Sequence, residues 1–480
     1  MAILITHCPI RWQAINNAQS IALQSDQQQF TYQQIDSLLI NLQEQLSPQI
    51  QTVNTEKQPI RLICIANNGI ELVLLQLLSI RLGWLFCPLN PRFTDSEIKQ
   101  RLDILNSDYC WVASNKNTQP NHIELNTLTI DFTVTNDAIK HPLPLLSINP
   151  LQPCNIIFTS GSSGFPKAIV HHYQNHFFSA LGSQTLIPLD INDHNLLSLP
   201  LFHIGGYATV LRTMIAGACL HLTQTTLDLS LLQQRKITHL SLVSTQLIRL
   251  LADLDFKYVT CAIKHILLGG SAFSEHLLDA LKTRKFNYHL SYGCTELASQ
   301  VATSSNNTQL QLLPYRQIKI DNDEIYLRGE TRFIGYFENN TIVKIDKNQW
   351  VASGDTGEIN DGILQITGRK DRQFISGGEN IKPEEIERIC LQHPTIKQAY
   401  IYPIKDVEYG QRIVLFIAFY NENIAFDIQA QQLREYLKTQ LTGFKQPLHY
   451  LTWPTFPDNN QALKVTKQTF QNIIKKRGWD

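Results

Sequence analysis

Residues 154–167 of the chain are Cys154-Asn155-Ile156-Ile157-Phe158-Thr159-Ser160-Gly161-Ser162-Ser163-Gly164-Phe165-Pro166-Lys167. The apolar run predicts a buried strand, and the hydroxyl residues and glycines after it predict a turn. Glycine has no Cβ, so the backbone can turn there and approach a ligand closely. Hydroxyl groups and free backbone N–H groups in such a turn bind anions, and a lysine adds positive charge. We therefore expect a phosphate-binding loop formed by Thr159, Ser160, Gly161, Ser162, Ser163, Gly164 and Lys167.

This loop does not have the spacing of a Walker A motif, because Gly161 and Gly164 are too close together and Ala168 follows the lysine. A flexible Ser/Gly-rich loop is the alternative on composition alone. The motif Thr-Ser-Gly-Ser-Ser-Gly-x-Pro-Lys resembles the phosphate loop of the adenylate-forming superfamily, which contains acyl-CoA synthetases, adenylation domains and luciferases. The resemblance implies an α/β fold, with a large N-terminal domain of stacked sheets and flanking helices and a small α+β C-terminal lid.

Length and composition indicate a multidomain globular protein whose ligands are small molecules. A chain of 480 residues predicts two to three domains, and 43% hydrophobic with 17% charged residues is a globular composition. Lysine plus arginine equals aspartate plus glutamate at 41 each, which argues against a nucleic-acid surface or a polybasic membrane anchor. The nine cysteines contain no C-x-x-C pair, and the N-terminus does not read as a signal peptide. We therefore expect reduced thiols and a cytoplasmic location. We also expect no membrane insertion, because the apolar window 72–86 contains Gln76, Ser79 and Arg81.

The order of apolar segments predicts parallel β-α-β units. Thr31 is the expected N-cap of a helix, and residues 61–66, 72–82 and 83–90 predict a strand, a helix and a strand. Residues 195–207 predict a strand that ends in a Gly205-Gly206 turn, and a helix follows it. Further strands are expected at 168–172, 239–243 and 266–271. Ligands bind where the carboxyl ends of such strands converge, so Gly270 and Ser271 are candidate ATP-binding residues.

A second motif, Tyr292-Gly293-Cys294-Thr295-Glu296, follows about 130 residues after the loop, a spacing that the resemblance also predicts. The ring of Tyr292 can stack on a base, and the hydroxyl of Thr295 can reach a phosphate. Glu296 offers a hard oxygen ligand of the kind that Mg²⁺ takes. An ordinary turn-to-helix cap is the alternative reading of these residues. We expect Tyr292 and Gly293 to bind ATP, Thr295 and Glu296 to be catalytic, and Glu296 to hold the metal.

The third motif combines Gly354-Asp355 with Gly368-Arg369-Lys370-Asp371. A carboxylate can accept both ribose hydroxyls, so Asp355 is the ribose candidate, and Arg369 suits the α-phosphate or the ribose. A turn aspartate followed by a solvated charge run is the alternative. The resemblance implies a hinge at Asp371 between a domain of residues 1–370 and a mobile lid of residues 371–480. It also implies that Lys464 is the catalytic lysine, where a surface lysine is the plainer reading.

The resemblance implies two half-reactions. A carboxylate and Mg·ATP give an acyl-adenylate and pyrophosphate, and the thiol of coenzyme A then displaces AMP. Four segments look most like the o-succinylbenzoate–CoA ligases of menaquinone biosynthesis within the superfamily. They are residues 199–206, Arg212, residues 376–385 and residues 463–467, and the double glycine in the third predicts a hairpin before a helix that begins with a proline. This resemblance suggests His203, Gly206 and Arg212 for acyl binding. Arg212 would meet the second carboxylate of such a substrate, although a helix arginine could equally be exposed.

Three rival functions share these nucleotide-binding residues. They are another aryl- or acyl-CoA synthetase, a stand-alone adenylation enzyme that loads a carrier protein, and a non-catalytic nucleotide-binding relative. The last is disfavoured because both Lys464 and Glu296 are present. The sequence does not fix the oligomeric state, for which a homodimer is one option.

Overall fold

The computed structural model describes residues 2–50, 59–107, 109–113, 128–132, 143–160, 166–223, 227–252, 262–271, 273–454, 465 and 467–479. The α-helices are α1 (Pro9–Asn16), α2 (Tyr32–Leu46), α3 (Ile70–Leu82), α4 (Asp95–Leu105), α5 (Tyr173–Gln184), α6 (Ile204–Ala216), α7 (Leu229–Gln234), α8 (Ser244–Ala252), α9 (Glu275–Thr283), α10 (Pro383–Gln392), α11 (Phe426–Gln440) and α12 (Lys467–Lys476). Short 3-10 turns are η1 (Ala2–Ile5), η3 (Thr295–Leu297), η4 (Lys370–Arg372) and η5 (Gly443–Lys445). Within the described ranges no helix combines the length and the apolarity needed to cross a membrane.

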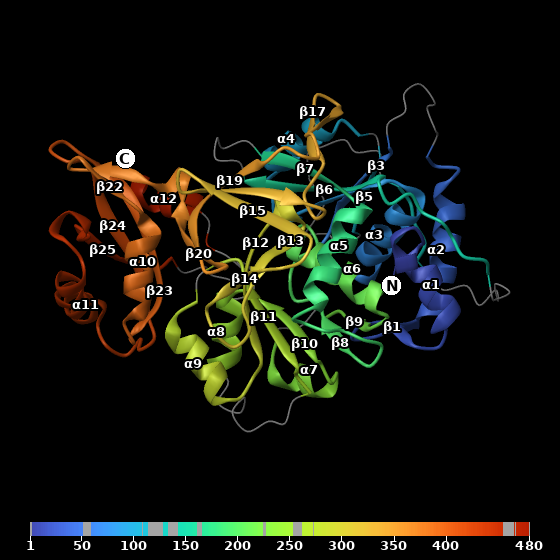
Figure 1. Cartoon of the computed structure of the whole chain (residues 1–480), viewed down its shortest axis with the longest axis horizontal. Helices are drawn as coiled ribbons and strands as arrows, with labels where there is room; N and C mark the ends of the chain where they lie inside the picture. The colour runs from blue at the N-terminus through green and yellow to red at the C-terminus, as the bar shows by residue number, and fades with distance from the viewer. Residues whose placement is uncertain are drawn as a thin grey trace.

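A large sheet of 13 strands runs through the middle of the molecule in the order β15-β16-β19-β20-β14-β13-β12-β11-β10-β8-β9-β1-β2 (Figure 1). Its strands are β1 (Ile21–Gln24), β2 (Gln29–Thr31), β8 (His194–Leu196), β9 (Cys219–His221), β10 (His239–Leu242), β11 (His265–Gly269), β12 (Tyr288–Cys294), β13 (Ser299–Thr303), β14 (Leu310–Leu312), β15 (Arg316–Asp321), β16 (Glu324–Gly329), β19 (Val351–Asn360) and β20 (Ile363–Arg369). The neighbours from β9 to β12 pair in parallel, whereas β12 to β15 pair antiparallel. The parallel strands therefore end together beside the antiparallel part.

A second sheet of seven strands has the order β18-β17-β7-β6-β4-β3-β5. It consists of β3 (Arg61–Ile65), β4 (Leu85–Leu89), β5 (Tyr109–Val112), β6 (Pro153–Ser160), β7 (Pro166–His172), β17 (Gly335–Glu338) and β18 (Thr341–Lys344). Strands β3 and β4 pair in parallel around α3, as the β-α-β pattern predicts. Strands β6 and β7 pair antiparallel, and the predicted phosphate loop lies between them in the sequence.

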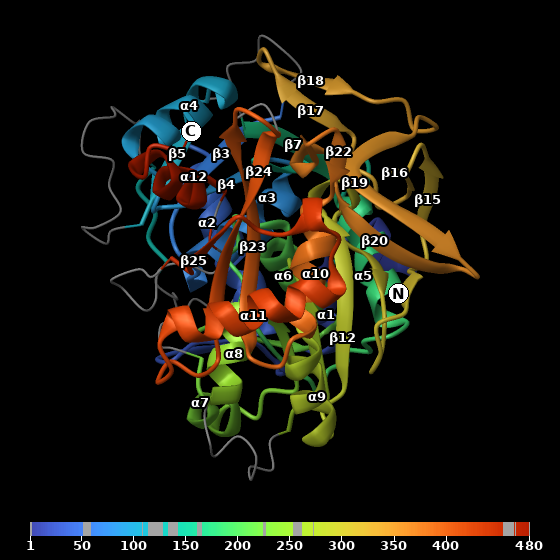
Figure 2. The same cartoon turned by 90° about the vertical axis from the view of Figure 1, so that its left-hand side faces the viewer.

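The C-terminal part has its own small sheet. Strands β23 (Ile396–Asp406) and β24 (Gly410–Phe419) pair antiparallel, and β25 (His449–Thr452) joins β24 in parallel. A hairpin of β21 (Phe374–Ser376) and β22 (Glu379–Ile381) precedes α10, as the double glycine predicts. Figure 2 shows this part facing the viewer, with α11 across the front. Its apolar residues form two clusters of their own, which lie within residues 374–479. The predicted domain boundary near Asp371 stays a prediction.

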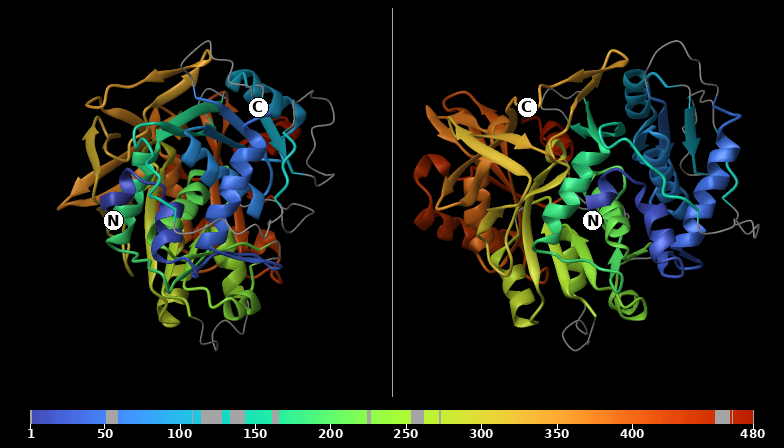
Figure 3. Two further views of the ribbon diagram at one scale, coloured as in Figure 1. Left: turned by 90° about the vertical axis from the view of Figure 1, so that its right-hand side faces the viewer. Right: turned by 45° about the vertical axis from the view of Figure 1, so that its right-hand side comes forward.

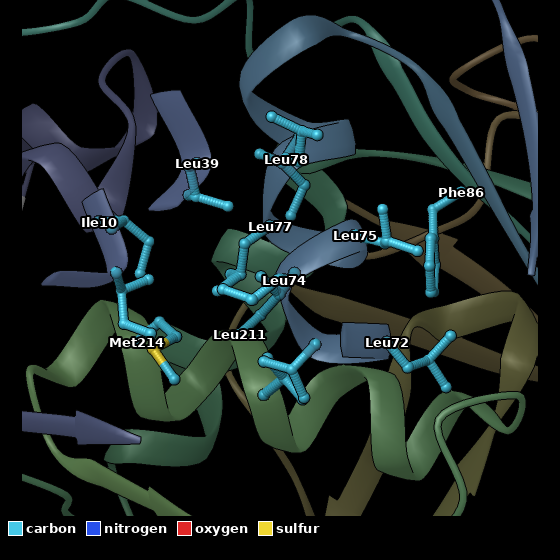
Figure 4. Packing of buried hydrophobic residues seen from close by; sticks show 14 of the residues in the cluster. Ile10, Leu39, Leu72, Leu74, Leu75, Leu77, Leu78, Phe86, Leu211 and Met214 are labelled. Carbon is cyan, nitrogen blue, oxygen red and sulfur yellow. The ribbon is translucent and has the colours of Figure 1, made fainter. Parts of the chain in front are cut away.

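The largest apolar core packs α3 between other helices (Figure 4). Leu74 and Leu77 of α3 belong to one cluster with Leu211 and Met214 of α6, and Gln76 of α3 donates to the Tyr207 carbonyl at 3.2 Å. Helix α3 is apolar on every side, so it is buried all round rather than along one stripe. The N-terminal helices α1 and α2 lie at the opposite end of the molecule from the C-terminal sheet (Figures 1 and 3).

Local signals identify most of these elements, with one error. The predicted cap of α2 is confirmed, because Thr31 and Gln34 form a capping box. The predicted strand at 195–207 is wrong, because β8 ends at Leu196 and the two glycines lie in the first turn of α6. A Cβ on Gly206 would stand 2.2 Å from the Pro200 carbonyl oxygen. The glycine is therefore there for close packing of the helix start, and it does not make a turn.

Candidate active site

The phosphate-loop hairpin supplies a cation to the candidate site. Thr159 of β6 pairs with Lys167 of β7, and Ser160 ends β6. The exposed Lys167 ammonium lies 5.8 Å from the ring centroid of Tyr336 in β17. The predicted ATP-binding residues Gly161, Ser162, Ser163 and Gly164 lie outside the described residues. The lysine therefore lies opposite Thr159, where β6 ends and β7 begins in the second sheet.

The second motif lies at the end of β12 and in the η3 turn. The carbonyl of Thr295 is 2.8 Å from Nε2 of His171 in β7, which ties η3 to the phosphate-loop hairpin. Gly293 is packed so closely against β13 that a Cβ would stand 2.3 Å from the Ser299 carbonyl oxygen. No side chain fits at that point, so the glycine is required by the strand pairing itself.

Glu296 is a partly buried carboxylate on which the positive charges of Arg369 and Lys167 act. Burial raises the pKa of Glu296 above its ordinary value, and Asp355 adds to this rise. Its own backbone N–H, Arg369 and Lys167 work in the opposite direction. Among the described residues no cationic side chain forms an ion pair with it at 4.0 Å or less. Glu296 thus retains oxygen lone pairs for a hard cation such as Mg²⁺.

Asp355 is held in place from two sides. The hydroxyl of Tyr292 donates to its Oδ2 at 2.6 Å, and Nη1 of Arg369 donates to its Oδ1 at 2.9 Å. Residues 355 and 369 are register partners in β19 and β20, which explains why two distant parts of the chain meet here. Burial, then Cys294 and Asp355, raise the pKa of Tyr292, so its hydroxyl remains a donor. Asp355 therefore presents a fixed carboxylate at this edge of the sheet.

Arg369 also connects Asp355 to the predicted hinge. Its Nε donates to Asp371 Oδ1 at 3.1 Å, and Asp371 lies in the η4 turn. Although burial alone would lower the pKa of Arg369, Asp355 and Asp371 together raise it above its ordinary value. Lys370 next to it donates to Glu324 at 2.6 Å. The arginine is therefore a permanent cation shared by two carboxylates.

The carboxyl ends of the parallel strands β11 and β12 lie side by side, as expected. Gly269 of β11 pairs with Ser291 of β12, and Gly270 follows with a φ of +82°, a conformation that favours glycine. The hydroxyl of Ser271 donates to that of Ser244, the first residue of α8, at 3.1 Å. Gly270 and Ser271 thus lie directly beside the strand that carries Tyr292.

The predicted acyl-binding residues lie on or just before α6. His203 is exposed at the N-cap position of α6, and Gly206 is buried in its first turn. Arg212 is half-buried, so the alternative of an exposed helix arginine is wrong. Its Nη1 donates to Gln300 Oε1 at 3.2 Å, and among the described residues it has no carboxylate partner. Burial lowers the pKa of Arg212 to about 10.

A second arginine lies close to Arg212. Arg316 is 4% exposed and donates to the carbonyls of Gln300 at 2.9 Å and of Pro314 at 2.7 Å. Burial, followed by the charge of Arg212, lowers the pKa of Arg316 to about 9. The backbone carbonyls partly satisfy Arg316, whereas Arg212 keeps guanidinium N–H groups for an anion.

Three residues of this site were missed at the sequence level. Tyr336 lies against Lys167, His171 bonds to the carbonyl of Thr295, and Gln300 bonds to Arg212. None of them belongs to a recognisable motif, and each comes close to its partner only through sheet pairing. The predicted catalytic residue Lys464 lies outside the described residues. The roles predicted for all of the site residues stay predictions.

Comparison with known proteins identifies the class to which this fold and site belong. The model of the AMP-binding enzyme family matches residues 10–359, and that of the AMP-binding enzyme C-terminal domain matches residues 385–462. The chain belongs to the AMP-binding enzyme family. The 2-succinylbenzoate–CoA ligase of Escherichia coli (strain K12) is 34% identical over 417 residues, covering 85% of this chain and 86% of the relative. The ligase of the same name from Haemophilus influenzae is 34% identical over 420 residues, covering 86% and 87%.

Solved structures agree with this assignment. A variant of E. coli MenE with bound OSB-AMS has a TM-score of 0.84 at 30% identity, covering 98% of this chain and 99% of that chain. The o-succinylbenzoate coenzyme A synthetase from Bacillus subtilis in complex with ATP and magnesium ion has a TM-score of 0.78 at 25% identity, covering 95% and 98%. The predicted resemblance to the adenylate-forming superfamily and the predicted fold class are confirmed.

Proposed function

We propose that this chain is an AMP-forming acid–thiol ligase that joins o-succinylbenzoate to coenzyme A in menaquinone biosynthesis. The observation that carries the proposal is the connected set of Lys167, Glu296, Asp355, Arg369 and Tyr292 at the strand ends. Such a set combines a ribose acceptor, two cations and a magnesium-type carboxylate, which is what Mg·ATP requires. The relatives named 2-succinylbenzoate–CoA ligase and the related structure with ATP and magnesium support this assignment.

The chemistry asks the protein to position reactants and to balance charge. A carboxylate oxygen of the acid attacks the α-phosphorus of ATP, and the bond from that phosphorus to the pyrophosphate oxygen breaks. The coenzyme A thiol, after losing its proton, attacks the acyl carbon, and the bond to AMP breaks. Negative charge gathers on the phosphate oxygens in the first step, so fixed cations lower its barrier.

Each predicted residue has one task in this scheme. Asp355 would accept hydrogen bonds from the ribose hydroxyls, and Arg369 would remain beside the same sugar or the α-phosphate. Lys167 and the loop residues 159–164 would hold the outer phosphates. Glu296 and the hydroxyl of Thr295 would face the metal and the phosphates, and the bound Mg²⁺ would neutralise phosphate charge.

The acyl side of the site supports a dicarboxylic substrate. Arg212 is a half-buried cation without a carboxylate partner among the described residues, and Arg316 beside it increases the positive potential. The second carboxylate of o-succinylbenzoate would supply the missing counter-charge, with His203 and Gly206 bordering the acyl group. A hydrophobic acid would leave this guanidinium uncompensated.

We propose a domain boundary between residues 370 and 371, with residues 371–480 acting as a lid that turns at Asp371. The separate apolar clusters within 374–479 support the boundary. Lys464 would come from this lid to bridge the carboxylate and the α-phosphate during adenylation. The eight cysteines with described positions are free thiols, which supports a reducing compartment such as the cytoplasm.

Pyrophosphate release across a panel of carboxylic acids, each with and without coenzyme A, tests the proposal. We expect o-succinylbenzoate to give the highest kcat/KM, and AMP release to require coenzyme A. Preference for a monocarboxylic acid would overturn the substrate assignment. AMP release that requires a carrier protein instead of coenzyme A would identify an adenylation enzyme that loads a carrier.

A further inference from the structure

Two neighbouring strands of the large sheet bring three metal-ligating side chains together, away from the candidate active site. His194 in β8 pairs with Cys219 in β9, and His221 stands two residues further along β9. Alternate residues of a strand share a face, and register partners in parallel strands do so too. The three side chains therefore project from one face of the sheet. One ligand atom from each, a ring nitrogen or the sulfur, lies within 4.8 Å of the other two.

This face is opposite to the one that packs on α6. Asn195, the residue after His194, points the other way and donates to Thr213 of α6 at 2.9 Å. Leu196, two residues after His194, packs with Leu231 and Leu232 of α7. The histidine–cysteine cluster (His194, Cys219 and His221) thus lies on the α7 side of β8 and β9, whose positions Figure 1 shows.

The cluster has the burial of a built site. Cys219 is 4% exposed and His221 is 1% exposed, whereas His194 is partly open to solvent. Nδ1 of His194 and Nε2 of His221 are 2.7 Å apart, so they share one proton in a hydrogen bond. The other ring nitrogen of His221, Nδ1, is buried with no partner among the described residues. A neutral imidazole has one donor and one acceptor, so this ring uses only half of its bonding capacity.

We propose that His194, Cys219 and His221 form a binding site for Zn²⁺ that is separate from the ATP site. Two imidazole nitrogens and one thiolate are ligands that zinc prefers, and three protein ligands leave a fourth position for water at the open side near His194. Magnesium, which takes oxygen ligands, would not bind here. The site is therefore selective against the ion that the proposed reaction uses.

The two imidazole rings need only a small adjustment to accept the ion. With Zn–N bonds of about 2.0–2.1 Å, tetrahedral nitrogens stand about 3.3 Å apart, so the two rings would separate by about 0.6 Å. The shared proton would move to the other nitrogen of its own ring, and two N–Zn bonds would replace the N–H···N bond. The thiol would release one proton to solvent and form the S–Zn bond.

The nearest charge to the cluster opposes a cation. Burial raises the pKa of the Cys219 thiol to about 12, so this thiol has to lose its proton when it binds zinc. Arg235, the residue after α7, lies close enough to act electrostatically on Cys219 and His221, and its positive charge repels a cation. Asp26 holds this guanidinium at 3.2 Å and partly neutralises it. A neutral imidazole keeps a lone pair on one ring nitrogen, so each histidine can bind the ion through one nitrogen.

Metal titration of the full-length, metal-free protein tests the proposal, with Co²⁺ as a spectroscopic probe for Zn²⁺. We expect one equivalent of Co²⁺ with a thiolate-to-cobalt charge-transfer band in the near ultraviolet, which Zn²⁺ abolishes by displacement. Cys219→Ser should remove the band, and His221→Gln should weaken binding at least tenfold. Matched controls are Cys110→Ser, a buried thiol in the other sheet, and His289→Gln, which lies on β12. Both should bind as the wild type does.

Thermal unfolding with and without Zn²⁺ is a second measurement, for variants that fold too poorly for the metal titration. Zn²⁺ should raise the midpoint of thermal unfolding of the wild type and of both controls, and it should leave Cys219→Ser and His194→Asn unchanged. A cobalt complex without a thiolate band would overturn the proposal. Equal stoichiometry and affinity in the wild type and in Cys219→Ser would overturn it as well. Neither readout depends on ligase activity, so the outcome is independent of the proposed function.

Discussion

Replacing Arg212 with methionine should impair recognition of a dicarboxylic substrate and stabilise the free protein at the same time. The side chain is half-buried, and among the described residues it has an amide partner, Gln300, but no carboxylate partner. Burial lowers its pKa from 12.5 to about 10. At about 1.4 kcal/mol per pKa unit, holding this charge in the folded state costs about 3–4 kcal/mol. Because the folded pKa is the lower one, this cost is present at every pH below about 10.

The substrate carboxylate would offset that cost. Two unit charges about 4 Å apart at an effective dielectric constant of about 20 interact by about 4 kcal/mol, and a hydrogen bond to a charged group contributes about 1.5–3 kcal/mol. We therefore expect Arg212→Met to lose about 2–4 kcal/mol of transition-state stabilisation, or about 30- to 1000-fold in kcat/KM. An analogue without the second carboxylate should lose less than about threefold. The free variant should gain about 1–2 kcal/mol in unfolding free energy, since the hydrogen bond to Gln300 is lost.

The assay is steady-state pyrophosphate release with both acids, together with thermal unfolding of the free protein. Arg212→Lys keeps the charge and should lie between the wild type and Arg212→Met. Arg328→Met is the matched control, because this arginine lies over the Trp350 ring at the surface and should change neither quantity. If Arg212→Met reduces kcat/KM for both acids by the same factor, the guanidinium does not read the second carboxylate and the reasoning is refuted.

Three other predictions concern the nucleotide side of the site. Lys464→Ala should reduce pyrophosphate exchange at least about 100-fold while ATP binding by calorimetry survives, and wild-type exchange would contradict its role. Gly293→Ala places a Cβ 2.3 Å from the Ser299 carbonyl, so unfolding free energy should fall by about 1–3 kcal/mol with loss of activity, and an unchanged denaturation midpoint would contradict this. The positive charge of Lys167 lowers the pKa of Glu296, so Lys167→Gln should raise that pKa and move the acid limb of kcat/KM to higher pH, whereas an unmoved limb would exclude the coupling.

The sequence predicts the local parts of this structure well. The helix cap at Thr31, the β-α-β unit around α3 and the double-glycine hairpin before α10 each depend on residues close in sequence. Residues 195–207 are the exception, because an apolar run with two glycines has no period that distinguishes a strand and turn from a helix start. The reason for Gly206 is contact with the Pro200 carbonyl, which periodicity does not encode.

The site can be predicted only at the residues that belong to a recognisable sequence motif. The motifs indicate Asp355 and Arg369 as nucleotide ligands, but their hydrogen bond comes from the register of β19 and β20. The contacts of His171 with the Thr295 carbonyl and of Arg212 with Gln300 join residues 124 and 88 positions apart. Such contacts follow from sheet pairing and helix packing, which no local pattern in one sequence specifies.

The burial of α3 on every side has a consequence for synthesis of the protein on the ribosome. This helix ends at residue 82, but α6, which covers it with Leu211 and Met214, is complete only at residue 216. At about 5–20 residues per second, the nascent chain would carry an apolar helix that α6 does not yet cover for roughly 7–27 s. During that interval the emerging chain is a natural client for a chaperone that binds exposed leucine-rich segments.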